Sequence, residues 1–72
     1  MIIKKRKGIR EVERKNKIML FNTYTYEKIQ LIGKAADTWK NLSFDSYIYI
    51  TLSNDIESLV LDLISKKYIE VL

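Results

Sequence analysis

The hydrophobic and polar positions of the chain change their period at Gly33. From Tyr24 to Leu31, apolar and polar residues alternate in β-favouring types, which predicts a strand. After Gly33 the apolar positions recur at spacings of three and four through Trp39 to Leu42, which predicts an amphipathic helix. The chain is therefore expected to pass from a strand directly into a helix at this glycine.

Two segments before this strand also have strand patterns. Ile9–Arg14 alternates charged and apolar residues, and Lys17–Asn22 is mostly apolar. Lys15 and Asn16 suit a tight turn between them, because Asn tolerates a positive φ. Short connections place consecutive strands side by side, so we predict an antiparallel three-stranded meander with residues 24–31 at one edge.

The second half of the chain predicts helices. Asn54, with Glu57 three residues later, resembles a capping box at the start of the last helix. Asp45 can cap a short helix over Ser46–Leu52, although the same residues alternate as a strand does, and we predict the helix. The predicted fold class is α+β, with a three-stranded antiparallel sheet followed by three helices in a single domain over residues 1–72.

Charge is distributed unevenly along the chain. The formal net charge is +4, but residues 1–17 carry eight Lys and Arg against two Glu, and residues 42–72 carry two Lys against five acidic residues. Residues 1–8 are predicted to form a basic N-terminal arm, loose or at a sheet edge, with Gly8 as its hinge. This asymmetry indicates an acidic partner near the front of the chain, although a solvated arm carries the same pattern.

The composition excludes several kinds of chemistry. There is no Cys and no His, which removes thiol chemistry, the usual zinc clusters and imidazole acid–base catalysis. We therefore expect a non-catalytic protein without a cofactor or metal. No long apolar run suggests a signal peptide or a membrane span, so we expect a cytoplasmic protein that does not contact a membrane.

Two stretches carry a resemblance to a known family. The run Leu31–Leu42, LIGKAADTWKNL, resembles the strand-to-helix junction of the PqqD-like family of recognition elements in ribosomally made, modified peptide pathways. The run Ile56–Ile69, IESLVLDLISKKYI, is similar to that family's closing helix and its exit. The chain departs from the family at Ile32, where members commonly carry Asn, and at Lys67 and Tyr68, where members commonly carry a Gly.

The resemblance implies a winged-helix-like fold and a non-catalytic function. Such domains bind the leader segment of a precursor peptide and deliver it to a maturation enzyme, either a leader peptidase as in lasso-peptide pathways or a radical-type enzyme. The peptide adds as a strand to the edge of the segment at about 24–31, against the last helix at about 55–67. The residues that match the family's peptide-binding positions are Tyr26, Glu27, Lys28, Ile29, Gln30, Leu31, Leu59, Asp62, Leu63 and Lys66.

Some of these residues also suit a purely structural role. Lys28 and Lys66 can attract acidic residues of the leader, but Lys28 also suits the protection of an exposed edge from aggregation. Ile29, Leu59 and Leu63 can floor an apolar pocket, but the two leucines suit the core better than a pocket. The same edge predicts a weak homodimer, which added leader would dissociate.

Two other classes of function remain open. A winged-helix nucleic-acid binder needs Arg, Lys, Asn or Gln on a recognition helix, and the last helix offers Asp55, Glu57 and Asp62 instead. Only the basic arm favours nucleic acid, so nucleic acid is not the expected partner. A structural subunit that stabilises a larger enzyme would show the same small core.

Overall fold

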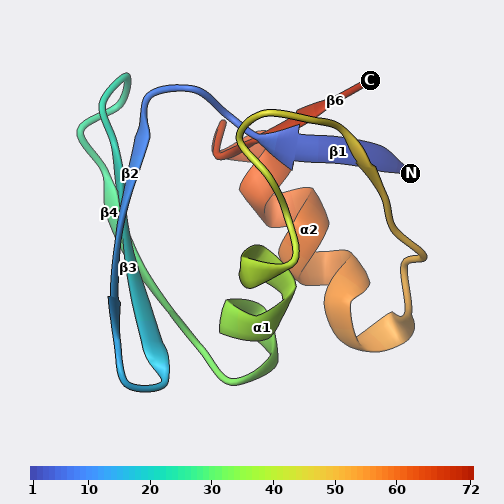
Figure 1. The fold of residues 1–72 in the computed structure, drawn as a ribbon, viewed down its shortest axis with the longest axis horizontal. Helices are drawn as coiled ribbons and strands as arrows, with labels where there is room; N and C mark the ends of the chain where they lie inside the picture. Colours follow the sequence, from blue (N-terminus) through green and yellow to red (C-terminus); the bar gives the residue numbers. More distant parts are fainter.

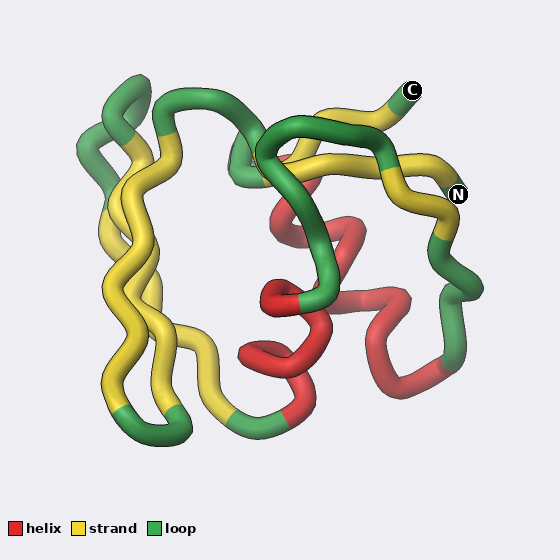
Figure 2. The backbone as a smooth tube through the Cα atoms, in the orientation of Figure 1, coloured by secondary structure: helices red, strands yellow, loops and turns green.

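Six strands and two helices make up the computed structural model, which describes residues 1–72 (Figure 1). They are β1 (Ile2–Lys5), β2 (Ile9–Arg14), β3 (Lys17–Asn22), β4 (Lys28–Ile32), α1 (Lys34–Lys40), β5 (Ile48–Tyr49), α2 (Asn54–Ser65) and β6 (Ile69–Val71). The strands form two antiparallel sheets with the orders β2-β3-β4 and β5-β1-β6. Both helices lie in the angle between the two sheets (Figure 2).

The sheet β2-β3-β4 is the meander that the alternation predicts, with β4 at one edge and β2 at the other. The turn between β2 and β3 has Lys15 at a φ of 52°, and Arg14 pairs with Lys17 across it. Side chains alternate between an inner face, which includes the buried Ile18 and Leu20 and faces the helices, and an outer face that points away from them. The third predicted strand begins at Lys28 rather than at residue 24, because residues 23–25 form a turn and the Asn22 N–H group donates to the carbonyl group of Glu27 across it.

The prediction of a winged-helix-like fold with three helices is wrong. Within Ser46–Leu52 the structure has the short strand β5 instead of a helix, with Ile48 paired to Ile3 and Tyr49 paired to Ile2. The alternating tyrosines and isoleucines of this segment favour a strand. The strand that pairs with this segment is β1, near the N-terminus, and the local sequence of residues 46–52 does not reveal this pairing.

The predicted basic arm is the central strand of the second sheet. β1 lies between β5 and β6, its Ile3 is fully buried, and its Lys5 is 6% exposed. Gly8 turns the chain from β1 into β2 with a φ of 96°, as its role as a hinge requires. A Cβ atom on Gly8 would lie 2.6 Å from the ring of Tyr24, so a larger residue would have to displace this ring and would also be strained by the positive φ.

One hydrophobic core joins both sheets and both helices. Its buried members are Ile3, Ile9, Ile18, Leu20, Leu31, Ala36, Trp39, Leu42, Val60, Leu63, Tyr68 and Ile69. Trp39 of α1 is fully buried, and its indole N–H donates to the Glu11 carboxylate over 2.5 Å. The same carboxylate lies 3.3 Å from the ammonium group of Lys5, so this cluster ties the two sheets together. Neither helix has the length and apolar character needed to cross a membrane.

Candidate functional site

β4 has a free backbone edge. On one side it pairs with β3, from Phe21 opposite Lys28 to Lys17 opposite Ile32. Outside this pairing, no backbone-to-backbone hydrogen bond involves residues 28–32. The main-chain donors and acceptors on the other side of β4 are therefore open to a further strand.

A buried asparagine fixes the start of this edge against the end of α2. Asn22 is fully buried, and its side-chain amide donates to the carbonyl groups of Lys66 and Lys67, both at 3.2 Å. Its side-chain oxygen accepts from the backbone N–H groups of Tyr24 at 2.9 Å and Thr25 at 3.3 Å. All the polar atoms of this side chain thus have partners, and the turn before β4 is joined to the end of the helix.

Tyr68 makes a second connection between the same two elements. Its hydroxyl donates to the backbone carbonyl of Glu27 over 3.2 Å and lies 3.4 Å from the carboxylate of the same residue. Burial raises the pKa of Tyr68 to about 12, and the neighbouring Glu27 carboxylate adds to this increase. The phenol therefore remains protonated, and a donor, at any physiological pH.

A polar hollow lies between these two connections. It has a volume of about 290 Å³ and is lined by Thr25, Glu27, Ser65, Lys66 and Lys67. The acidic and basic side chains come from opposite walls, because Glu27 precedes β4 and the two lysines follow α2. Lys66 also forms an ion pair with Asp62, one turn earlier, at 3.4 Å. The hollow suits a polar or charged side chain of a bound chain rather than an apolar one.

The predicted strand residues lie along this edge, in two different settings. Residues 28–31 belong to β4, with Lys28 and Gln30 exposed on the outer face. Ile29 and Leu31 point to the inner face, where Leu31 is a buried member of the core. Tyr26 and Glu27 lie in the turn before the strand.

The predicted helix residues divide into core and surface. Leu63 is buried in the core, and Leu59 and Ile29 are partly buried against it. None of these three lines a hollow, so the structure does not bring them together as the floor of a pocket. Asp62 and Lys66 are exposed, and only Lys66 joins Glu27 at the polar hollow.

Sequence reasoning missed two features of this region. Asn22 and Tyr68 were not candidate residues, because their importance depends on contacts between segments more than 40 positions apart. The outer face of β2-β3-β4 was also missed, although the alternation of Ile9–Arg14 already separates its arginines from its glutamates.

No three acidic side chains lie close enough together to hold a metal ion. Comparisons of the chain with protein-family models, curated proteins and solved structures give no match.

Proposed function

We propose that this protein binds an extended peptide by adding it as a strand to the free edge of β4. The observation that carries this proposal is the row of backbone groups of residues 28–32 that have no partner beyond β3. The resemblance of Leu31–Leu42 to the PqqD-like family supports the identity of the peptide as the leader segment of a ribosomally synthesised precursor. The protein then acts without catalysis in the cytoplasm and delivers the peptide to a modifying or processing enzyme.

The geometry of strand addition defines what each part of the site does. Main-chain hydrogen bonds to β4 give affinity, and alternate peptide side chains point to the two faces of the enlarged sheet. On the outer face they would lie beside Lys28 and Gln30, so an acidic residue next to Lys28 is favoured. At the start of β4, the hollow between Glu27 and Lys66 can accept a polar side chain.

The opposite edge of the sheet is a poorer site for a peptide. Along β2 the charged residues are Arg10, Glu11, Glu13 and Arg14, and charges on an edge strand discourage pairing with another chain. β4 carries only one charged residue, Lys28. The edge of β2 is therefore better protected against pairing with another chain than the edge of β4.

A matched pair of proline variants tests this proposal. Ile29→Pro distorts β4, and Val12→Pro places the same residue at the middle of the other edge strand, β2. The ligand is the N-terminal half of any small precursor peptide encoded beside this protein, titrated by calorimetry. We expect Ile29→Pro to weaken binding at least about tenfold and Val12→Pro to leave it within about twofold, because only β4 pairs with the peptide.

Both variants need a check of the fold by circular dichroism, because a small domain has little stability to lose. Equal weakening by two folded variants would exclude β4 as the specific site. Unchanged binding by folded Ile29→Pro would exclude strand addition at this position.

A further inference from the structure

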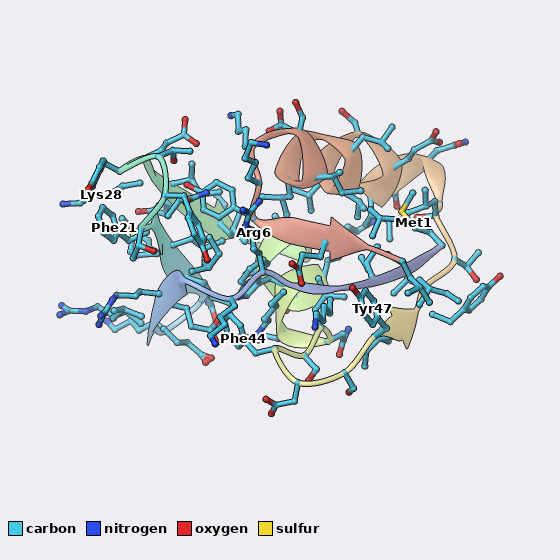
Figure 3. All side chains as sticks on the ribbon, turned by 90° about the horizontal axis from the view of Figure 1, so that it is seen from above. Met1, Arg6, Phe21, Lys28, Phe44 and Tyr47 are labelled. Atoms are coloured by element: carbon cyan, nitrogen blue, oxygen red, sulfur yellow. The ribbon has the colours of Figure 1, made fainter.

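The outer face of β2-β3-β4 has a regular arrangement of side chains, of which the proposed peptide site uses only Lys28 and Gln30. The registers of the two strand pairs place nine residues in three rows across the sheet. The rows are Arg10-Phe21-Lys28, Val12-Met19-Gln30 and Arg14-Lys17-Ile32. Phe21 and Lys28 lie together on the side of the strands away from both helices (Figure 3). We call these nine residues the cationic face.

No acidic residue balances the charges of this face. Its four cations, Arg10, Arg14, Lys17 and Lys28, are exposed and form none of the ion pairs of the protein. The two glutamates of β2 point to the inner face instead, since they pair in register with buried residues of β3. There they form ion pairs with Lys5 and Lys40, at 3.3 and 3.5 Å.

The arrangement is unfavourable for the folded chain by itself. Arg14 and Lys17 lie directly opposite each other on neighbouring strands, and like charges in this position destabilise a sheet. The same repulsion opposes the packing of this face on the same face of a second copy. An anionic ligand relieves it, so the charge distribution favours a ligand of opposite sign.

Aromatic rings stand beside the cations at one end of the face. Phe21 lies between Arg10 and Lys28 in its row, and its ring centroid is 6.5 Å from that of Tyr26. Tyr26 is 78% exposed, and its φ of 63° is one that non-glycine residues seldom adopt. Its backbone N–H donates to the carbonyl group of Asn22 over 2.8 Å, which holds the ring in this exposed position.

We propose that the cationic face binds single-stranded nucleic acid. Arg10, Arg14, Lys17 and Lys28 contact phosphates, and Phe21 and Tyr26 provide a surface on which unpaired bases stack. Proteins that bind single strands without sequence preference combine these two elements, and bases held in a duplex do not expose their faces to such rings. This site lies on a sheet face, so it needs no recognition helix, and of its phosphate-binding residues only Lys28 also lies beside the proposed peptide.

The test measures the fluorescence anisotropy of an end-labelled oligothymidylate of about 12 nucleotides, with the 72-residue protein as titrant. We expect saturable micromolar binding at about 50 mM NaCl that weakens steeply by about 200 mM. Four phosphate contacts predict a slope of log K against log salt of about −2.8, because each contact on a single strand contributes about −0.7.

Three variants test separately the cations of the cationic face, the stacking of bases on Tyr26 and the net charge of the whole protein. Arg14→Gln with Lys17→Gln removes the like-charged pair without weakening the fold, and should reduce affinity at least about tenfold and the slope by about 1.4. Tyr26→Asn keeps a residue that tolerates positive φ, and should weaken binding about fivefold with the slope unchanged. Lys4→Gln with Lys34→Gln changes the net charge equally, away from the cationic face, and should leave affinity within about twofold.

Four results would overturn this proposal. They are the absence of saturable binding at the lower salt concentration, an equal loss of affinity in the variant of Lys4 and Lys34, tighter binding of a duplex of the same length, and displacement of the oligonucleotide by an oligoglutamate of equal charge. The last result would reassign the cationic face to an acidic protein surface.

Discussion

The two faces of the sheet β2-β3-β4 are built from the same three strands but differ in burial and in the pairing of their charges. On the inner face, Ile18 and Leu20 are buried, and Glu11 has a charged partner and an indole donor. On the outer face, Met19 is 38% exposed and Arg10 has no acidic partner. Since side chains alternate along a strand, one-residue steps separate the interactions that stabilise the fold from those left for a ligand.

This difference separates the positions that stabilise so small a domain from the positions that do not. A chain of 72 residues buries a limited core, so its inner face has little room for ligand contacts. The outer face and the free edge of β4 contribute little to the core and are therefore available. Substitutions at neighbouring positions of one strand should consequently have very different effects.

The largest contrast is expected between Leu20 and Met19. Leu20→Ala removes a side chain that is 1% exposed from the core and should lower the free energy of unfolding by about 3 kcal/mol. Met19→Ala, on the opposite face, should lower it by about 0.5 kcal/mol. Urea denaturation followed by circular dichroism measures both. Similar losses in the two variants would mean that the outer face is covered in the free protein.

The next contrast is between Glu11 and Arg10. Glu11→Ala leaves the buried ammonium group of Lys5 and the indole N–H of Trp39 without their acceptor, which should cost about 2 kcal/mol. Arg10→Ala breaks no ion pair and should change stability by less than about 0.5 kcal/mol. Thermal denaturation at neutral pH gives the comparison. An unchanged stability of Glu11→Ala would show that this carboxylate does not tie the two sheets together.

A smaller effect is expected from Tyr68 at high pH. The pKa of Tyr68 is about 12 in the folded protein and near 10 when unfolded, so folding favours the protonated phenol. Its contribution to stability is complete below pH 10 and decreases as the pH rises towards 12. Urea titrations across this range should show that the advantage of the wild type over Tyr68→Phe shrinks. A constant difference would mean that burial does not raise the pKa of this hydroxyl in the folded protein.

The smallest effect is a gain in stability. Lys17→Glu replaces the like-charged pair with Arg14 by an opposite-charged pair, and should raise the free energy of unfolding by about 0.5 kcal/mol. The same variant should bind the oligothymidylate more weakly, because it removes one cation and adds an anion to the cationic face. Loss of stability together with retained binding would contradict both statements.

Local patterns predicted part of the fold correctly. The alternation and the turn predicted at Lys15 and Asn16 gave the meander, although the positive φ lies at Lys15 rather than at Asn16. The spacing after Gly33 gave α1, because these elements depend on neighbours in the chain. The helix predicted over Ser46–Leu52 was wrong, because pairing with β1 near the N-terminus makes this segment the strand β5. The apolar floor of the site was misplaced for a similar reason: Leu63 can be assigned to the core only once α2 has been packed against both sheets.

The most direct test of the central claim is an amide NMR titration of the labelled protein with the leader half of any small precursor peptide encoded beside it. If the peptide adds to β4, saturable shifts should centre on residues 27–32 and 65–67, and the outward-pointing amide groups of β4 should become protected from hydrogen exchange. Saturable shifts that leave β4 unchanged, or the absence of any saturable shift, would contradict strand addition.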